Sequence, residues 1–323
     1  MDLGGSVVLR GAEMGQYIAR RLFWLIPTLL AISLVTFIVM HATPGSPLQP
    51  MAANANPLPP DAQKNLAHAW GLDKPLWQQY VLFVWNGVHL NFGTSFIYRT
   101  RTVTEILAQT FPVSLHLGAM ALAMAILVGV PLGILAAVNQ NGPIDYLTSF
   151  LATLGVAVPN FVLAILFIVV FVIGLHWLPD AGGWKRPADW VLPTLALGLG
   201  PMAILARYTR SSMVEVLRQD YIRTAEAKGL AFRRVVTTHA VKNGLLAPLT
   251  IVGPMFAAIG TGSFFVETLF QVPGMGQFFV TSMTGRDYPV IMAVILLYGV
   301  FLAVMNLVVD LFYGVVDPRI RYE

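Results

Sequence analysis

The chain has 323 residues, of which 56% are hydrophobic and only 11% charged, with a formal net charge of +4. This composition is too apolar and too poor in charge for a soluble globular domain, so we expect an integral membrane protein. The chain has no cysteine, which excludes disulfides, thiolate nucleophiles and cysteine metal ligands. Its six histidines show no i, i+4 pairing, so no metal site is indicated.

Six runs without Asp, Glu, Lys or Arg are long enough to cross the hydrocarbon core as helices, which takes about 20 apolar residues. They are residues 22–40, 111–138, 146–178, 190–206, 243–266 and 288–309. The fourth is the shortest, and the third is long enough to tilt or to extend past the bilayer. The sequence therefore predicts an all-α polytopic membrane protein with six transmembrane helices.

Lys and Arg concentrate in cytoplasmic loops, so their distribution predicts the orientation. With the N-terminus inside, thirteen of the 20 basic residues are cytoplasmic, eight of them between Arg207 and Lys242. We expect a cytoplasmic N-terminal segment at 1–21, an extracytoplasmic region at 41–110, a core at 111–313 that contains a cytoplasmic loop at 207–242, and a cytoplasmic tail at 314–323. The chain starts at Met1 or, because MGQYIARRLF would itself make a reasonable start, at Met14.

The region 41–110 divides into two parts. The run PGSPLQPMAANANPLPPD is rich in Pro and favours turns and extended chain. The run LDKPLWQQYVLFVWNGVHL predicts an amphipathic helix that lies on the membrane face, with its tryptophans at headgroup level, or a small cap that packs on the other helices. Its apolar residues at helical spacing are Leu76, Tyr80, Val81 and Val84, with Trp77 and Trp85 alongside.

The basic loop carries two short amphipathic patterns. Read as helix, it places one set of residues four apart on one side: Met213, Leu217, Tyr221 and Ala225. Gly229 interrupts this set, because glycine weakens a helix and permits a sharp turn. A second set follows: Phe232, Val235, Val236 and Ala240. We expect two helices joined at Gly229 in a compact knob, which docks on a cytoplasmic partner or is attracted to anionic headgroups.

The residues YIRTAEAKGL, from Tyr221 to Leu230, and HAVKN, from His239 to Asn243, resemble the EAA coupling loop of ABC-transporter permeases of the dipeptide and oligopeptide (DppB/OppB-like) family. The wider superfamily has Glu-Ala-Ala, three residues and Gly. Here Arg223, Thr224 and Ala225 precede Gly229, a departure typical of the peptide branch.

The resemblance extends over nearly the whole chain from Met14. It includes YIARRLFWLIPTLL, PGSP, GLDKPLWQQY, LNFGTSF, PGMGQFF, RDYP and DLFYGVVDPRIRY. Ser46 and Asn91 stand where the family usually has Asp, so no role of an acid is transferred to those positions.

The resemblance implies a type I ABC importer permease fold in a bacterial cytoplasmic membrane, with both termini cytoplasmic. It implies half of a pathway for di- or oligopeptides, beside a second homologous permease chain, two cytoplasmic P-loop ATPases and an extracytoplasmic binding protein. Because the chain has no G-x-x-x-x-G-K-[ST] motif, ATP and Mg belong to the ATPases. We therefore expect no enzyme activity, no cofactor on this chain and no nucleic-acid partner. Nickel complexes, glutathione or oligosaccharides are alternative substrates, and a channel is a distant alternative.

The resemblance also implies the residues of the coupling site. They are Tyr221, Arg223, Thr224, Ala225, Ala227, Lys228 and Gly229 in the docking knob, with His239 and Asn243 bracing the return into the fifth span.

Candidate pathway residues follow from the fifth span, which is rich in small and kink-forming residues. Gly253, Pro254 and Gly260 either line a pathway or pack closely against a neighbouring helix. His116 lies within an apolar run, where it either binds or gates, or forms a neutral hydrogen bond between helices. Glu267 either attracts a cationic group or the binding protein, or is a solvated acid at a helix end. At the tail, Asp310 and Asp317 are expected to form weak pairs with Arg319 and Arg321.

Overall fold

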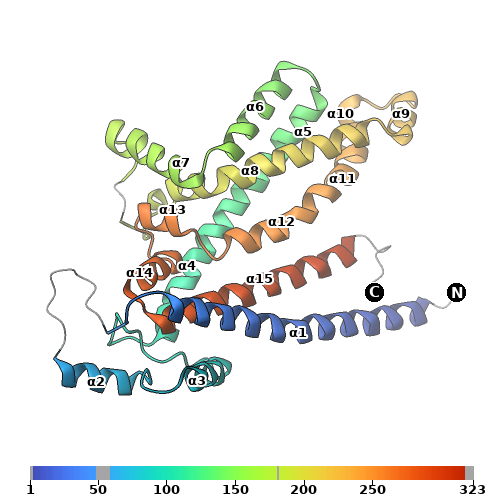
Figure 1. Cartoon of the computed structure of the whole chain (residues 1–323). Coiled ribbons are helices and arrows are strands. Elements are labelled where there is room, and N and C mark those ends of the chain that lie inside the picture. Colours follow the sequence, from blue (N-terminus) through green and yellow to red (C-terminus); the bar gives the residue numbers. More distant parts are fainter. Residues whose placement is uncertain (1–2, 49–58, 180–181, 317–323) are drawn as a thin grey trace. The chain divides into compact units, whose positions relative to one another are not determined.

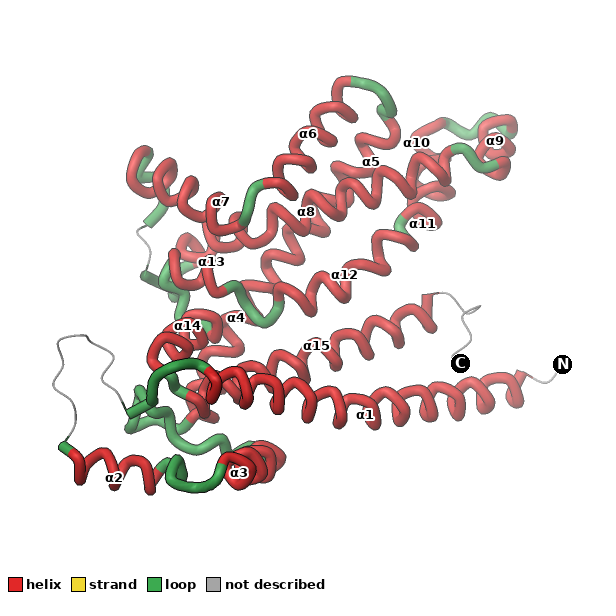
Figure 2. Tube along the Cα trace, in the orientation of Figure 1, coloured by secondary structure: helices red, strands yellow, loops and turns green. Residues whose placement is uncertain are grey.

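The structure, a computed structural model, describes residues 3–48, 59–179 and 182–316 (Figure 1). Within these residues the secondary structure is helical except for one isolated bridge between Thr94 and Thr102 (Figure 2), which confirms the all-α class. Asp317, Arg319 and Arg321 lie outside the described residues, as does the side chain of Asp310. The chain divides into two units, Met1–Phe111 with Phe278–Glu323 and Pro112–Gln277.

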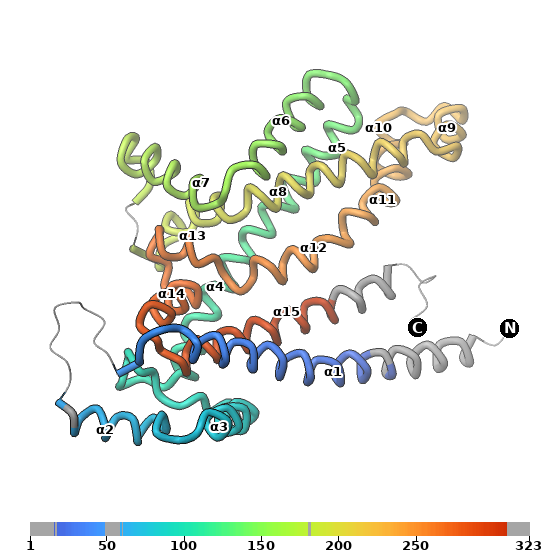
Figure 3. The backbone as a smooth tube through the Cα atoms, in the orientation of Figure 1, coloured from blue at the N-terminus to red at the C-terminus, as the bar shows by residue number. Residues whose placement is uncertain are grey.

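The first unit is built on the long helices α1 (Leu3–Ala42) and α15 (Tyr288–Val316), which pack side by side (Figure 3). It also contains α2 (Pro60–Ala69), α3 (Leu76–Val88), the start of α4 (Val103–Met124) and most of α14 (Met275–Gly285). A small core joins α1 and α15 and receives Tyr80 and Phe83 from α3; its buried members are Phe37, Met40, Ile291 and Met292.

The predicted amphipathic helix is α3, and its two faces differ in their contacts and exposure. The Tyr80 hydroxyl lies 3.0 Å from the hydroxyl of Ser33 and 3.1 Å from the carbonyl oxygen of Leu30 on α1. Trp77 and Trp85 are exposed. The helix therefore packs on α1 through one face and presents its tryptophans outward on the other.

The sequence RDYP clamps two other segments of the first unit. The Arg286 guanidinium donates a hydrogen bond of 2.8 Å to the carbonyl of Pro44, just after α1. The buried Asp287 carboxylate accepts bonds from the Ser95 hydroxyl and from the N–H groups of Phe96 (3.0 Å) and Ile97 (3.3 Å). These contacts fix the loop after α3 and the end of α1 to the start of α15.

The second unit contains the remaining helices, in chain order. After α4 they are the π-helical turn Ala125–Gly129, α5 (Val130–Val138), α6 (Pro143–Ala157), α7 (Asn160–Phe167) with the π-helical Ile168–Gly174, α8 (Pro187–Leu217), α9 (Asp220–Ala227), α10 (Phe232–Val235), the π-helical Val236–Ala240, α11 (Val241–Gly244), α12 (Leu246–Ile259) and α13 (Phe264–Leu269).

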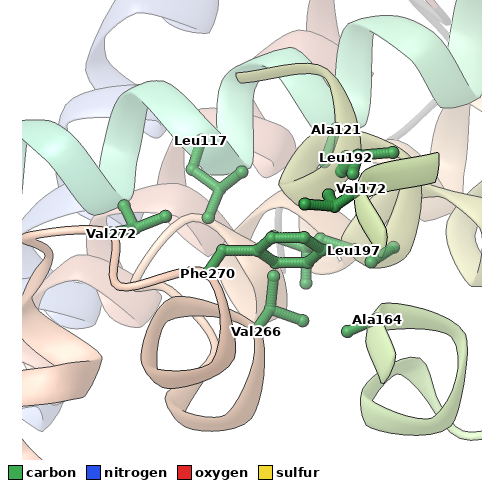
Figure 4. Close-up of a cluster of buried hydrophobic side chains, with 10 residues drawn as sticks. Leu117, Ala121, Ala164, Val172, Leu192, Leu197, Val266, Phe270 and Val272 are labelled. Atoms are coloured by element: carbon green, nitrogen blue, oxygen red, sulfur yellow. The ribbon is translucent and has the colours of Figure 1, made fainter. Parts of the chain in front are cut away.

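Small residues let the π-helical turn Ala125–Gly129 and α5 approach α8 closely. A Cβ atom on Gly129 would lie 2.6 Å from the carbonyl oxygen of Met202, and one on Gly133 would lie 2.6 Å from the Cβ of Thr209. Such approach increases the dispersion contacts that hold helices together where the hydrophobic effect is weak. Figure 4 shows a second contact, in which Phe270 and Val266 lie among residues of α4, α7 and α8. That cluster anchors α13 within the unit.

Four helices of the described chain are long and apolar enough to cross a membrane, and two bent pairs raise the number to six if each is one span. The third predicted span is not straight: α6 and α7 meet at 102°. Val158 and Pro159 are both extended there, because proline has no N–H and excludes the preceding residue from the helical region.

The fifth predicted span also differs from the expectation. Its helical path begins at Phe232, within the basic loop, bends by 49° between α11 and α12, and ends at Ile259 instead of residue 266. Pro248 cannot donate to the carbonyl of Gly244, which accounts for the bend. Gly262 has a φ of +94° and turns the chain into α13. The fourth span is longer than expected, because α8 continues through Pro193 and Pro201 to Leu217.

Candidate functional site

The loop between α8 and α12 folds as the expected two helices joined at Gly229. Helix α9 ends in a Schellman motif: the Gly229 N–H donates to the Glu226 carbonyl (2.9 Å), and the Leu230 N–H donates to the Ala225 carbonyl (3.4 Å). Gly229 has a φ of +80°, which glycine adopts without strain, and no atom lies within 4 Å of where a Cβ would stand. The turn is therefore fixed by its backbone and open on its outer side.

The interior of this knob, residues 220–244, is a small apolar cluster that rests on α5 and α8. Its buried members are Ala137, Met213, Ile222, Ala225, Val235, Val236 and Ala240. The predicted stripe was wrong at Tyr221, which is 41% exposed while its neighbour Ile222 is 1% exposed, and right at Ala225, which is buried. Helix α8 ends at Leu217 and Gln219 is extended, so α9 starts with a new phase. Phe232, placed in the second stripe, is 48% exposed.

The predicted coupling residues divide between the outside and the inside of the knob. Ala225 is buried and supports it from within, and His239 is half-buried in the π-helical turn. The exposed ones are Tyr221, Arg223, Thr224, Ala227, Lys228, Gly229 and Asn243. The Asn243 amide donates a hydrogen bond of 2.9 Å to the Tyr221 hydroxyl, which ties α9 to α11. Sequence reasoning missed the exposed ring of Phe232, beside the exposed Arg233 and Arg234.

An ion pair between a partly exposed arginine and a buried carboxylate fixes α8 where it approaches the knob. Arg210 contacts both carboxylate oxygens of Asp145 on α6, with 2.7 Å from Nη2 to Oδ2. The Asn141 N–H (2.9 Å) and the Ser149 hydroxyl (3.4 Å) also donate to Asp145. Every oxygen of this buried carboxylate is thus satisfied, and α6 is held to α8. The sequence analysis did not single out either residue.

Glu267 is fully buried, so the interpretation as a solvated acid was wrong. Its Oε2 accepts from the N–H groups of Gly276 (2.8 Å) and Gln277 (3.4 Å), and Oε1 accepts from the N–H of Ser263 (3.3 Å). Burial raises the pKa of the Glu267 carboxyl to about 7, against hydrogen bonds that lower it. In this conformation the carboxylate does not face open space.

The other candidate pathway residues lie in different surroundings. The ring of His116 packs edge-on against Trp190 (4.9 Å between centroids) and Trp184 (5.6 Å), and the expected hydrogen bond between helices is not seen among the described residues. Gly260 packs against Gly118 of α4, because a Cβ atom on Gly118 would lie only 2.6 Å from the Cα atom of Gly260. Gly253 is buried and Pro254 exposed. A pathway role for these residues stays a prediction.

A cavity of about 530 Å³ lies in the first unit between α1, α2, α3 and the start of α15, lined by aromatic rings that include Trp70 and Phe96. Its volume is typical of ligand sites. However, the Gln79 amide already donates to the Lys74 carbonyl (2.8 Å), and His68 bonds to Asp73 (2.8 Å). Because these polar groups already form hydrogen bonds within the protein, they favour a structural role for the cavity over a ligand site. The described residues contain no group of three or more His, Asp or Glu placed to hold a metal ion.

The fold is that of a type I ABC importer permease. It is similar to a solved structure described as inward facing conformations of the MetNI methionine ABC transporter, with a TM-score of 0.55 and 17% identity over 66% of this chain and 96% of that chain. A crystal structure of an amino acid ABC transporter with histidines gives a TM-score of 0.50, with 16% identity over 65% of this chain and 93% of that one. At these identities the likeness concerns the fold alone.

The family follows from the sequence comparisons. Residues 129–322 match the family model "Binding-protein-dependent transport system inner membrane component", and residues 14–118 match its N-terminal counterpart. The dipeptide transport system permease protein DppB of Bacillus subtilis (strain 168) is 44% identical over 95% of this chain and 98% of its own length. The oligopeptide transport system permease protein OppB of Escherichia coli (strain K12) is 42% identical over 96% of this chain and 100% of its own. The chain belongs to this family of multi-pass inner-membrane permeases.

Proposed function

We propose that this chain is the permease subunit of an ATP-driven importer and provides half of a translocation pathway for di- or oligopeptides. Its relatives at 44% and 42% identity are dipeptide and oligopeptide permeases over almost their whole lengths. The observation that carries the mechanism is the knob at residues 220–244, which is braced inside and exposed outside. A second permease chain, two ATPases that bind ATP and Mg, and an extracytoplasmic binding protein complete the proposed assembly, with the knob and both termini in the cytoplasm.

The contacts of the knob explain how a push on it would move the spans. The buried cluster and the Tyr221–Asn243 bond make α9, α10 and α11 one body, so a force on α9 reaches both α8 and α12. The Asp145–Arg210 pair extends this body to α6. Closure of the ATPases would thus tilt several spans together, which is the motion that alternating access needs.

The basic surface of the knob is suited to docking. Arg223, Lys228, Arg233 and Arg234 are exposed, as is the ring of Phe232. An exposed apolar ring and several exposed basic side chains fit a partner surface that offers an apolar groove and acidic groups. Attraction to anionic headgroups uses the same charges but needs no defined turn at Gly229.

Gly229→Asp tests the coupling role. The side chain meets no atom of this chain, so the cost in folding free energy is limited to the backbone conformation, about 1 kcal/mol. We expect the complex to assemble and peptide uptake to fall at least tenfold while ATP hydrolysis persists, as measured in proteoliposomes with the binding protein.

Gly93→Asp is the matched control. Gly93 has a φ of +78°, also has no atom within 4 Å of its Cβ position, and lies outside the knob. Equal loss of uptake in the two variants would show a general folding defect, and undiminished uptake by Gly229→Asp would refute the coupling role.

The composition of the assembly is tested by purifying the tagged chain from its own host and identifying bound proteins by mass spectrometry. Recovery of a second permease chain with two P-loop ATPases is expected. The ligand on the associated binding protein would distinguish peptides from nickel complexes, glutathione or oligosaccharides. Recovery of the chain alone would contradict the proposal and favour a channel.

A further inference from the structure

A groove of about 360 Å³ runs between α1 and α15 in the first unit, and its walls come from these two helices alone. At its closed end the helices touch, since a Cβ atom on Gly299 would lie 3.0 Å from Cδ2 of Leu29 and 3.7 Å from Cδ1 of Ile32. From that contact the two helices separate toward the N-terminus of α1 (Figure 3). The volume falls within the range of ligand sites, about 300–1,000 Å³.

The length of this α1–α15 groove matches one leaflet of a bilayer. On α1 it is lined from Arg21 at one end to Ile32 at the other. A helical rise of about 1.5 Å per residue places these residues about 16 Å apart along the helix axis. The hydrocarbon core is about 30 Å thick, and Ile32 lies near the middle of the candidate span Ile18–Ala42. The groove therefore extends from the middle of the membrane to its surface at the N-terminal end of α1.

The walls of the groove are mostly apolar and open to the outside. Of the most apolar window of α1, only 6% is buried within this chain. On opposite walls, Trp24 is 62% exposed and Leu302 is 36% exposed. The hydroxyl of Thr28, also on the α1 wall, donates to the Trp24 carbonyl oxygen (2.8 Å). A hydrocarbon chain in the groove would therefore bury apolar surface on both sides and leave this hydroxyl paired.

The α15 wall adds a polar group that a ligand can use. Asn306 lines the groove, and within the described part of the chain its side-chain amide forms no hydrogen bond. It lies about 10 Å from Gly299 along α15, toward the open end of the groove. The amide therefore offers donors to an acceptor such as an ester carbonyl oxygen. This differs from the aromatic cavity of the same unit, where the Gln79 amide already donates within the protein.

The open end of the groove carries positive charge. Arg21 lines it, Arg20 is next in the sequence, and both are exposed. Among the described side chains of α1 and α15 they are the only Lys, Arg, Asp or Glu. Guanidinium groups bind phosphate through paired N–H donors, and basic pockets between membrane helices bind the head groups of anionic lipids. A zwitterionic head group would bring an ammonium group toward the same two arginines, which disfavours it.

We propose that the α1–α15 groove binds one anionic phospholipid, with an acyl chain between the two helices and the phosphate at Arg20 and Arg21. The bound lipid adds contacts to both helices where they diverge, and so stabilises their pairing. The proposed orientation places this lipid in the cytoplasmic leaflet, and only that assignment rests on the proposed function. A helix of a second permease chain is the competing occupant, but it would bring Arg21 into an apolar interface, where charged side chains are depleted.

The experiment uses the full chain, purified in micelles together with the proteins it retains, and counts bound lipids by native mass spectrometry. Phosphatidylglycerol is the probe, and phosphatidylcholine with the same acyl chains is the control lipid without net charge. Arg20→Gln with Arg21→Gln removes the charge, whereas Ala303→Phe fills the groove, which Ala303 lines. Two matched controls lie outside the groove: Lys64→Gln at an exposed position of α2, and Ala31→Phe at an exposed position of α1.

We expect one phosphatidylglycerol per copy of the wild-type chain, bound at least tenfold more tightly than phosphatidylcholine. The double arginine variant should lose at least tenfold in affinity for phosphatidylglycerol, because the phosphate then has no guanidinium partner. Ala303→Phe should lose as much, although its charges are unchanged, because the phenyl ring takes the place of the acyl chain. Lys64→Gln and Ala31→Phe should bind phosphatidylglycerol like wild type.

Equal binding of the two lipids by wild type would overturn the proposal, and this comparison decides the matter even if a variant fails to insert. Unchanged affinity in Ala303→Phe would place the lipid outside the groove and refute it as well. If Ala303→Phe instead loses a second permease chain and binds phosphatidylglycerol as before, a helix occupies the groove. Lipid binding as expected, without peptide uptake in wild type, would refute the proposed substrate and leave the lipid site standing.

Discussion

The Asp145–Arg210 pair should respond very unequally to the loss of each partner. The Asp145 side chain is 4% exposed and that of Arg210 is 30% exposed. Arg210→Met leaves a carboxylate that water cannot reach, which costs about 3–5 kcal/mol of the free energy of unfolding. Asp145→Asn leaves a guanidinium that can turn toward solvent and still bond the amide oxygen, so the cost should be that of an ordinary hydrogen bond to a charged group, about 1.5–3 kcal/mol.

The double variant makes the comparison sharper. Replacing both partners removes the uncompensated charge, so Asp145→Asn with Arg210→Met should be more stable than Arg210→Met alone, although it contains one more substitution. Unfolding free energies are measured by denaturant titration in mixed micelles, with tryptophan fluorescence as the probe. A double variant less stable than Arg210→Met, or an Asp145→Asn variant that costs more than Arg210→Met, would refute the argument from burial.

Two further contacts give smaller, local effects. The buried Asp287 carboxylate accepts hydrogen bonds from Ser95, Phe96 and Ile97, and Asp287→Asn keeps only one of its two acceptor oxygens. We expect the free energy of unfolding to fall by about 1–3 kcal/mol and hydrogen exchange at residues 95–97 to become faster. Unchanged exchange there would contradict the clamp. The Tyr221–Asn243 bond is exposed, so a double-mutant cycle with Tyr221→Phe and Asn243→Ala should give a coupling energy of about 0.5–1 kcal/mol. A value indistinguishable from zero would mean that this bond does not tie α9 to α11.

Runs of uncharged residues predicted where the spans lie but not where their helices end. Helix α4 begins at Val103, eight residues before the apolar run, because Thr102 and Glu105 bond each other's N–H groups at its start. Helix α8 likewise continues past the apolar run to Leu217. Apolarity measures the part of a helix that lipid can cover, whereas hydrogen-bonding groups near its ends decide where it begins and stops.

The sequence contains Pro159, but it does not show how strongly the chain bends at this proline. A proline in an apolar run either kinks a helix slightly or breaks it, and neighbouring helices decide which outcome is stable. Here the segment after the break packs on α8 and α13, which a count of apolar residues does not reveal. The glycine turn at Gly229 was predicted correctly because its cause is local. The phase error at Tyr221 arose at Arg218 and Gln219, where neither glycine nor proline marks the break.

The buried carboxylates show why part of a site cannot be found from one sequence. Asp287 is bonded to Ser95, 192 residues away, and Asp145 to Arg210, 65 residues away. For Glu267 the sequence left open a solvated acid or a group that attracts a cation or the binding protein, because most of its donors are backbone N–H groups that carry no sequence signal of their own. A carboxylate is expensive to bury unless donors surround it, so each of these acids marks a place where separate segments must meet. In this permease two of those places fix the ends of spans, and the third, at Glu267, joins the first turn of α14 to the turn before α13.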